Sequence, residues 1–332
     1  MRLKIALVSV LCMLLNTVAC ADPLIVVGHK NPDSDSIFSA ISLAHLRSQQ
    51  GIAAVPVAQG KPNPETQFAL DFFGLEAPTL LMKVAGRKVA LVDHNHYAQA
   101  PDDIRQADIV EIIDHHNLGG VSTAEPIEVL IKPVGCTSTI IWQLYQRANI
   151  SIPPAIAGGM LSAILSDTLI FRSPTTTDQD RAAAENLATI AHVNDIQKYG
   201  QSMFLAGEAD LKTAVIHLLI HRDLKNFEMN DNKIAVAQLM AVSFDLLKDR
   251  KEAFLEEMRK LQKEYAYKTV ILMLTDIKNE GTELLLIGKN AQHIAQAFNL
   301  VLKNDSVWIP GMMSRKKQMI PALEKVFDKE TS

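Results

Sequence analysis

Hydrophobic positions in the first two-thirds of the chain form short apolar runs that alternate with longer amphipathic stretches. Residues 24–27 (LIVV) are a continuous apolar run, and the runs at 88–93 and 108–114 each end in an aspartate. Runs of this kind, without alternating polar positions, are typical of parallel strands buried on both faces. Residues 37–50 instead repeat apolar positions at helical spacing. The alternation predicts an α/β fold with a parallel, helix-covered sheet.

Turn residues set the bounds of the other expected elements in this region. Gly51 and Gly74 follow two helical stretches, and Pro64 opens the second of them. We expect further strands at 52–58 and 127–134, and helices at 63–74, 137–148, 154–170 and 178–192. Ligands of such sheets bind at the carboxyl ends of the strands.

After about Gly207 the pattern changes to that of a second, smaller α/β domain. Two hairpins are expected, with turns at 230–232 and 279–281, and a long charged helix at 243–265. We therefore expect a first domain over 22–205, a hinge linker over 206–212 and a C-terminal domain over 213–332, with the active site in the cleft between the two domains.

The first 21 residues have the features of a secretory signal peptide. Arg2 and Lys4 precede an apolar run over 5–15, and Ala19-Cys20-Ala21 supplies a small-x-small cleavage site. The run is too short for a membrane span. We expect cleavage after Ala21 and an exported, periplasmic chain. A buried N-terminal element and a lipid anchor on Cys20 are the alternatives.

The composition of the chain argues against nucleic-acid binding, membrane spans and disulfide bonds. The chain has 332 residues, 48% of them hydrophobic and 21% charged, and a net charge of -4. That charge offers no attraction for extended nucleic acid, and no stretch of the mature chain predicts a membrane span. Only Cys136 remains after signal removal. It cannot form an intramolecular disulfide, and we expect it to be a small buried residue.

Acidic and histidine side chains gather where predicted strands end or in the turns that follow. These are residues 29–35 (HKNPDSD), Asp93, residues 114–116 (DHH) and Asp167. Strand ends of a parallel sheet share one edge, so these groups can converge there. Clustered carboxylates repel each other unless cations neutralise them, and mixed carboxylate and imidazole ligands suit manganese, cobalt or zinc. The number of ligands fits two ions about 3.5–4 Å apart.

Each motif also has a simpler interpretation. An aspartate at the end of a strand is more often a helix N-cap than a metal ligand, and Asp33 and Asp35 precede a predicted helix. The basic run at 314–317 (SRKK) follows a predicted strand, and such runs are usually solvated surface patches. Arginine and lysine are also the side chains that bind phosphate oxygens. Capping explains any one motif, but it does not explain their joint placement.

Taken in order, GHKNPDSDS, LVDHN, IIDHH, PVGCTSTII, LSAILSDTLIF and SRKKQ resemble the family II, manganese-dependent inorganic pyrophosphatases of the DHH phosphoesterase superfamily. The resemblance covers the mature chain. The DHH triplet marks only the superfamily, whereas its combination with the first motif and SRKKQ is specific to the pyrophosphatases. The resemblance implies hydrolysis of pyrophosphate by a hydroxide that bridges two metal ions.

The resemblance also implies the ligands, the substrate contacts and the assembly. It implies two Mn²⁺ or Co²⁺ ions, an additional Mg²⁺ that arrives with pyrophosphate, and a homodimer. Asp93 and His116 would be catalytic. The implied metal ligands are His29, Asp33 and Asp93 for one ion, and Asp35, Asp93, His115 and Asp167 for the other. The implied substrate contacts are His116, Lys225, Arg315 and Lys316.

Two positions depart from the family pattern. His96 stands where the family usually has glutamate, and Asn117 stands where a basic residue is common. Neither is an implied ligand.

Two other functions are also compatible with parts of the pattern. One is an exopolyphosphatase or a phosphodiesterase for short oligonucleotides, but these relatives carry a glycine-rich substrate motif that this chain lacks. The other is a non-catalytic periplasmic binder of metal or phosphate, although every implied ligand is present in this chain.

Overall fold

The computed structural model describes residues 22–242 and 247–328. The six N-terminal strands form one sheet in the order β3-β2-β1-β4-β5-β6, and all their pairings are parallel. Their bounds are β1 Leu24–Val27, β2 Ala54–Ala58, β3 Thr79–Leu80, β4 Lys88–Val92, β5 Asp108–Asp114 and β6 Glu128–Ile131. Successive side chains of β1 point to opposite faces of the sheet, since Val26 and Val27 belong to different apolar clusters. The predicted parallel α/β fold is confirmed.

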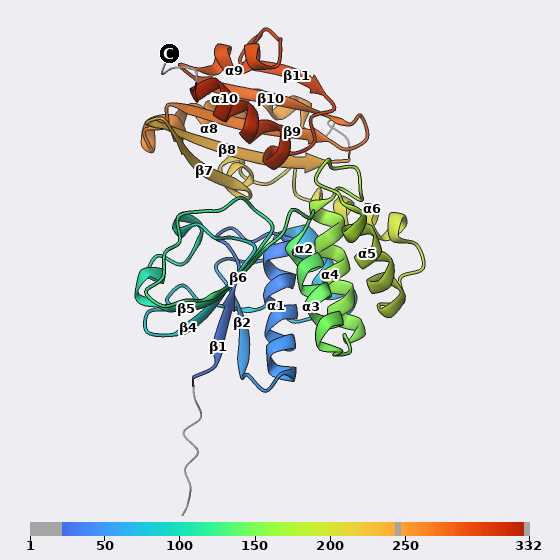
Figure 1. The fold of residues 1–332 in the computed structure, drawn as a ribbon. Coiled ribbons are helices and arrows are strands. Elements are labelled where there is room, and N and C mark those ends of the chain that lie inside the picture. Colours follow the sequence, from blue (N-terminus) through green and yellow to red (C-terminus); the bar gives the residue numbers. More distant parts are fainter. Residues whose placement is uncertain (1–21, 243–246, 329–332) are drawn as a thin grey trace, which may run out of the picture.

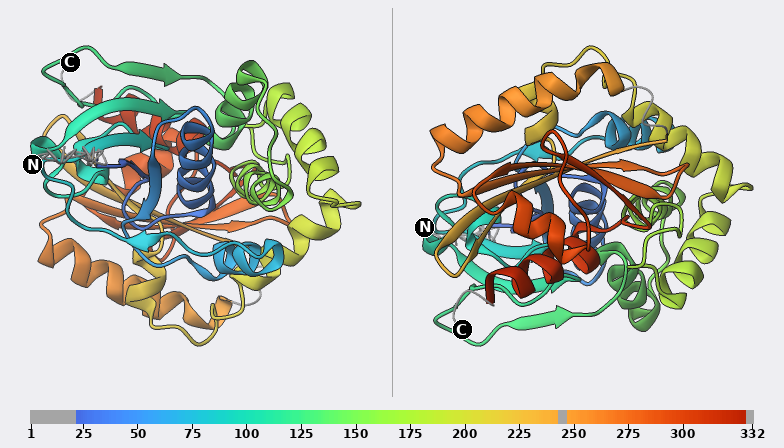
Figure 2. Two further views of the ribbon diagram at one scale, coloured as in Figure 1. Left: turned by 90° about the horizontal axis from the view of Figure 1, so that it is seen from below. Right: turned by 90° about the horizontal axis from the view of Figure 1, so that it is seen from above.

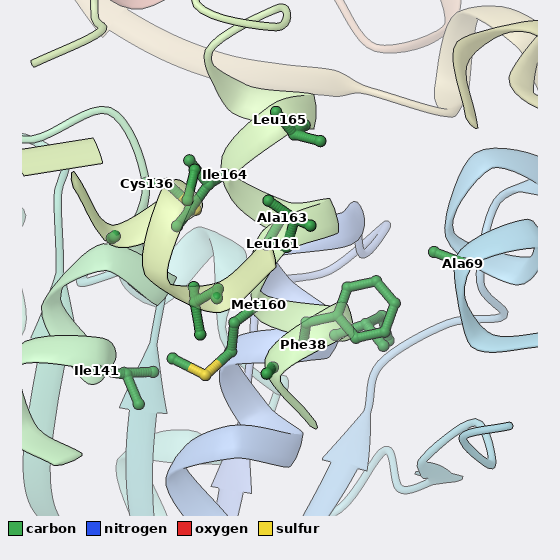
Figure 3. Close-up of a cluster of buried hydrophobic side chains, with 14 of the residues drawn as sticks. Phe38, Ala69, Cys136, Ile141, Met160, Leu161, Ala163, Ile164 and Leu165 are labelled. Atoms are coloured by element: carbon green, nitrogen blue, oxygen red, sulfur yellow. The ribbon is translucent and has the colours of Figure 1, made fainter. Parts of the chain in front are cut away.

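Helices cover one face of this sheet (Figure 1). Their bounds are α1 Ser34–Gln49, α2 Pro64–Phe73, α3 Thr137–Ala148, α4 Pro154–Asp167, α5 Asp178–Ile190 and α6 Ile196–Gly207. Asp33 caps α1 by accepting a hydrogen bond from the Ser36 N–H, and Asn63 caps α2 in the same way. The apolar cluster beneath these helices, shown in Figure 3, joins α1 to α4.

Helix α4 is shorter than the sequence predicts. It ends at Asp167 instead of residue 170, and the next turn places Leu169, Ile170 and Phe171 at positive φ. The Thr168 hydroxyl donates to the Ile164 carbonyl and accepts from the Phe171 N–H. These bonds compete with continuation of the helix and turn the chain back.

The C-terminal half forms a five-stranded mixed sheet in the order β11-β10-β9-β8-β7. The strands are β7 Leu224–Met229, β8 Asn232–Ala241, β9 Thr269–Asp276, β10 Gly281–Gly288 and β11 Ser306–Pro310. The helices are α7 Ile216–His221, α8 Lys251–Glu264, α9 Ala291–Ala297 and α10 Ile320–Asp328. Helices α7 and α8 contribute to the apolar cluster on one face, and α9 and α10 to the cluster on the other. Both predicted hairpins are present, joining β7 to β8 and β9 to β10.

Two predictions for this half need correction. The charged helix begins at Lys251 rather than 243, after a 3₁₀ turn over Lys248–Arg250, and residues 243–246 lie outside the described chain. The Arg250 guanidinium anchors this turn by donating to the carbonyls of Leu211 and Ala214. The basic run was predicted to lie between a strand and a short helix, but Arg315–Met319 forms a π-helical turn that continues into α10.

The two halves stack with the carboxyl edge of the parallel sheet facing the C-terminal half (Figures 1 and 2). A cleft of about 530 Å³ lies between them and is lined by residues of both halves. Across the described ranges, no helix combines the length and apolar character needed to cross a bilayer. The predicted signal peptide, residues 1–21, lies outside the described residues.

Candidate active site

The floor of the cleft is built from the ends of three adjacent strands. His29 follows β1, Asp93 follows β4, and Asp114 ends β5 with His115 directly after it. Since β1, β4 and β5 are neighbours in the sheet, their carboxyl ends deliver these side chains to one place. The structure therefore brings together the groups that the sequence predicts at this edge.

One group of possible metal ligands consists of His29, Asp33 and Asp93. His29 Nε2 lies 3.2 Å from Asp33 Oδ2 and 3.3 Å from Asp93 Oδ2. His29 Nδ1 donates to the Lys30 carbonyl at 2.8 Å, so Nε2 is the nitrogen that could bind a metal once its proton has left. An imidazole whose other nitrogen is held in this way is oriented as metal-bound histidines are. One ligand atom from each of the three residues lies within 4.8 Å of the others.

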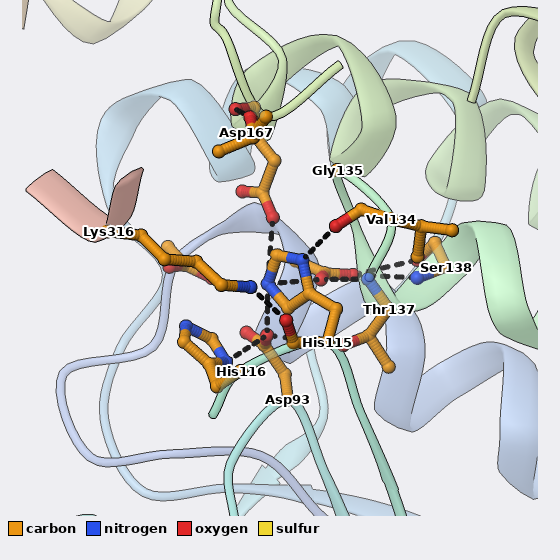
Figure 4. A network of polar contacts seen from close by, with 12 residues as sticks. Asp93, His115, His116, Val134, Gly135, Thr137, Ser138, Asp167 and Lys316 are labelled. Atoms are coloured by element: carbon orange, nitrogen blue, oxygen red, sulfur yellow. Dashed lines mark hydrogen bonds and ion pairs between the residues drawn. The ribbon is translucent and has the colours of Figure 1, made fainter. Parts of the chain in front are cut away.

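The second oxygen of Asp93 faces a different set of side chains. Asp93 Oδ1 lies 3.3 Å from His115 Nε2, and the same nitrogen lies 3.5 Å from Asp167 Oδ2 and 4.0 Å from Asp35 Oδ2 (Figure 4). His115 Nδ1 lies 3.2 Å from the Val134 carbonyl, which fixes its ring in turn. Asp93 thus stands between two ligand groups and presents one oxygen to each.

Asp167 reaches this site from the helical layer, in the helix that the sequence predicts over 154–170. It is the last residue of α4, not a residue at a strand end. Helix α4 packs against α1, whose first turn carries Asp35. The helix pair therefore supplies one side of the site and the strand ends supply the other.

Asp35 belongs to α1 and is fully buried, and its carboxylate lies against the N-terminus of α3. Its Oδ1 accepts from the Ser39 hydroxyl at 2.7 Å and from the Ser138 N–H at 3.0 Å, and its Oδ2 accepts from the Thr137 N–H at 2.6 Å. The unpaired N–H groups and the dipole of a helix N-terminus favour a carboxylate at this position.

The crowded charges displace the protonation equilibria of these side chains. Burial and the nearby Asp93 charge raise the pKa of Asp35 to about 6, and burial together with Asp35 raises the pKa of Asp167 well above its usual range. Burial opposes protonation of His29, but the charge of Asp33 and the hydrogen bonds to Asp33 and Asp93 together outweigh it and raise its pKa to about 10. The ligand set holds excess negative charge, which divalent cations would neutralise.

His116 is held at the rim of the site by Asp114. His116 Nδ1 donates to Asp114 Oδ1 at 2.8 Å, and the same oxygen accepts the backbone N–H groups of His115 and His116. Burial lowers the pKa of His116 to about 3, although Asp114 opposes this shift. The bond to Asp114 thus keeps the proton on Nδ1 of His116, whose ring lines the cleft.

The C-terminal half contributes three cations to the opposite wall. Lys225, Arg315 and Lys316, the residues of this half that the family resemblance implies as substrate contacts, all line the cleft. The Lys316 ammonium donates to the His115 carbonyl across the cleft. The Arg315 guanidinium donates to the Asp223 carboxylate and to the Asp223 carbonyl, both at 2.8 Å.

Cys136 lies close to Asp35 and Asp167, and these three residues form another group that could offer ligand atoms to a metal. The thiol is fully buried, and burial raises its pKa well above the usual value. In the metal-free protein burial thus disfavours the thiolate, which is the form that binds a metal. The predicted buried packing role is consistent with its place in the cluster of Figure 3.

The two departures from the family pattern both line the cleft. His96 is half-buried there, and Asn117 offers its carbonyl to the Asn95 side-chain amide at 2.9 Å. Neither belongs to a group that could hold a metal among the described residues.

Sequence reasoning missed several residues that support the site. Asp223 anchors Arg315, and Glu65 and Ser166 line the cleft beside Asp167. None of them stands in a motif, because their contacts join segments far apart in the sequence. Asp114 carried a signal only as part of the DHH triplet.

Comparisons with known proteins agree with this architecture. Residues 23–164 match the DHH family, N-terminal domain, and residues 201–326 match the DHHA2 domain. The chain is 44% identical over 314 residues to a probable manganese-dependent inorganic pyrophosphatase of Archaeoglobus fulgidus, covering 91% of this chain and 97% of that protein. It is 42% identical over 304 residues to the manganese-dependent inorganic pyrophosphatase of Bacillus subtilis, covering 91% and 98%.

A solved structure extends this likeness to three dimensions. The crystal structure of a candidate family II inorganic pyrophosphatase from Methanococcus jannaschii superposes with a TM-score of 0.85 at 37% identity. The match covers 92% of this chain and 99% of the other. With its DHH and DHHA2 domains and this likeness over nearly the whole length of its relatives, the chain belongs to the family of manganese-dependent, family II inorganic pyrophosphatases.

Proposed function

We propose that this chain hydrolyses inorganic pyrophosphate to two orthophosphates at a two-metal site on the floor of the cleft. The observation that carries the proposal is the position of Asp93, whose two oxygens face two separate ligand groups. A carboxylate in that position is suited to bridge two cations. The names of the relatives support both pyrophosphate as substrate and manganese as metal.

The metal ligands divide between the two ions by proximity. The first ion would be held by His29, Asp33 and Asp93, and the second by Asp35, Asp93, His115 and Asp167. Carboxylate oxygens and imidazole nitrogens suit Mn²⁺ and also Co²⁺, and Mg²⁺ is expected to enter with the substrate. When bound, the ions would lower the pKa of a water molecule and so supply hydroxide as the nucleophile.

The chain's own residues bind and orient the substrate. Lys225, Arg315 and Lys316 face the metal ligands across the cleft and match the oxygens of a highly charged anion. His116 would donate to a phosphate oxygen only as an imidazolium, and the negative charge of bound pyrophosphate would have to stabilise that form against the burial that lowers the pKa of His116. Positioning and charge neutralisation provide most of the catalysis in phosphoryl transfer.

The proposed division of the chain places a hinge over residues 206–212, between a catalytic domain over 22–205 and a substrate-binding domain over 213–332. The Arg222 guanidinium spans this segment, donating to Asp210 Oδ2 at 2.6 Å and to the Gly207 carbonyl at 3.4 Å. Closure over pyrophosphate would exclude water from the site.

We further propose that the chain is exported after cleavage near Ala21 and assembles as a homodimer. The charged, apolar and small-residue segments of the first 21 residues support export. An open edge at β6, where Val129 is exposed, supports association through the N-terminal sheet. Mass measurement of the secreted chain tests both statements.

A substrate comparison tests the proposed activity. The chain from Asp22 onward is stripped of metal, reloaded with Mn²⁺ and Mg²⁺, and offered pyrophosphate, tripolyphosphate and a dinucleotide separately. Selective release of phosphate from pyrophosphate is expected. Preference for tripolyphosphate or for the dinucleotide would favour the related phosphoesterase activities. Bound metal without hydrolysis would favour a binding protein.

A further inference from the structure

A buried carboxylate outside the proposed ligand sets lies between the segments that carry them. Glu65, in the first turn of α2, is 8% exposed. Its Oε1 accepts from the Ser34 hydroxyl at 3.2 Å and from the Ser166 hydroxyl at 2.5 Å. Ser34 lies between Asp33 and Asp35, and Ser166 directly precedes Asp167. One oxygen atom therefore joins the first turn of α1 to the last turn of α4.

The surroundings keep this carboxylate in place. The Ser34 hydroxyl also bonds the Thr66 hydroxyl at 2.9 Å, and all three of these side chains are buried. Gly207, the last residue of α6, packs so closely that an added Cβ would lie 3.2 Å from Glu65 Cβ. The end of α6, next to the proposed hinge, therefore packs directly against Glu65.

Burying a carboxylate is costly, and a fold gains little stability from one that accepts only from hydroxyl groups. Burial raises the pKa of Glu65 to about 7, although Ser166 and Ser34 oppose the shift. A function for the residue would account for this cost. Groups that orient metal ligands from behind commonly change metal affinity when they are replaced.

We propose that Glu65 is a positioning residue, which holds the Asp33–Asp35 turn and Asp167 at the separation that metal binding requires. The inference rests on the proposed two-metal site. Glu65 contacts neither substrate nor metal in this account and acts only through Ser34 and Ser166.

The experiment measures Mn²⁺ affinity, without turnover, by equilibrium dialysis of the metal-stripped chain. Glu65→Ala should weaken Mn²⁺ binding about 10- to 100-fold, the range for residues that support metal ligands. Glu65→Gln retains an oxygen that can accept both hydroxyl groups, and should restore most of the affinity. Ser166→Ala removes one of the two bonds and should give an intermediate loss.

Two controls separate positioning from a general structural role. Thr66→Val damages the same buried network without touching Ser166, and should lower the melting temperature of the metal-free chain while leaving Mn²⁺ affinity near wild type. Gln67→Ala, which removes an exposed bond to Asp71 on the same helix, should change neither quantity.

Three results would overturn the inference alone: unchanged affinity in Glu65→Ala, equal losses in Glu65→Ala and Thr66→Val, or no rescue by Glu65→Gln. A wild-type chain that holds no Mn²⁺ would overturn the proposed metal site, and this inference with it.

Discussion

Asp93 adopts a backbone conformation that side-chain-bearing residues seldom take, with φ at +61°. Its N–H donates to the Ile113 carbonyl at 3.0 Å, which ties the residue to the end of β5. Aspartate tolerates the left-handed region better than most residues, and such conformations cluster at functional sites. The turn directs the carboxylate between the two ligand groups.

Replacing Asp93 by alanine should therefore remove metal and activity together. We expect Asp93→Ala to lose both ions and to lower turnover at least about 100-fold, the scale of losing one group that stabilises the transition state. Arg315→Ala should lower turnover but keep the metal, because Arg315 lies on the opposite wall. Metal analysis of both purified variants checks this. Two ions retained in Asp93→Ala would exclude the bridging assignment.

Metal binding should depend on pH in a defined direction. The raised pKa values of Asp167 and His29 mean that the metal-free site carries protons at neutral pH, and Asp35, with a pKa of about 6, takes up a further proton below that pH. These protons must leave before a cation binds, so apparent Mn²⁺ affinity should rise with pH, about tenfold per unit for each proton released. Mn²⁺ titrations at pH 6, 7 and 8 test this, and an affinity that is flat or falls over this range would contradict it.

The residues that sequence could suggest were those whose type itself indicates metal or phosphate chemistry. Histidines and aspartates near predicted strand ends were visible because the sheet rule places such ends together. Asp223 and Glu65 were not visible, since a carboxylate in an ordinary helix or loop has no pattern that names its distant partner. Only the folded contacts with Arg315 and Ser166 distinguish them.

At the scale of elements, α4 determines how closely the helical layer can pack. Gly159 faces α1, and a Cβ there would lie 2.5 Å from the Phe38 ring. The close approach brings the end of α4, with Asp167, beside the first turn of α1, with Asp35. Packing of these two helices thus sets the distance between two proposed ligands.

Adding one methyl group at this contact should weaken the fold. Gly159→Ala should lower the free energy of unfolding by about 1–3 kcal/mol, the usual cost of overpacking a core. Gly120→Ala is the matched control, because nothing lies within 4 Å of the added Cβ. Denaturant unfolding of both metal-free variants gives the comparison. Equal stability of the two variants would show that α1 can shift to accommodate the methyl group.

Element type followed from sequence better than element ends did. Most strands and helices of the first half were expected because their apolar spacing is regular, but the short strand β3 and helix α6 were not predicted. The end of α4 was missed because the bonds of the Thr168 hydroxyl, not hydrophobic spacing, terminate it. The basic run was predicted between a strand and a helix, yet the Ser314 side chain caps it as part of the helix itself.

For the whole molecule, two lysines link the C-terminal half to the N-terminal half. Lys316 donates to the His115 carbonyl, beside the proposed metal ligands, and Lys317 donates to the Pro174 carbonyl at 3.1 Å on the exposed rim. Burial lowers the pKa of Lys316. The two lysines are adjacent in sequence, but Lys316 contacts a residue of the proposed metal site whereas Lys317 contacts the exposed rim.

This difference predicts unequal effects on catalysis. Lys316→Ala should lower kcat/KM about 100-fold, because a cation facing the substrate is lost. Lys317→Ala should change it only about twofold, the effect of an exposed contact. Steady-state kinetics with pyrophosphate distinguish the two variants. Comparable losses would mean that contact between the halves, rather than charge at the site, sets the rate.

The two-domain α/β arrangement was accessible from sequence because the hydrophobic pattern changes near Gly207. The orientation of the halves was not accessible from local patterns, since it depends on long-range contacts such as those of Lys316 and Arg222. The position of the cleft follows from that orientation.

The most direct test is a stepwise Mn²⁺ titration of the metal-stripped chain in the presence of Mg²⁺, with bound Mn²⁺ and pyrophosphate hydrolysis measured on the same samples. If hydrolysis requires both ions, it should appear only as the bound Mn²⁺ approaches two ions per chain. Full activity at one ion or none, or a chain filled with two ions that leaves pyrophosphate intact, would contradict it.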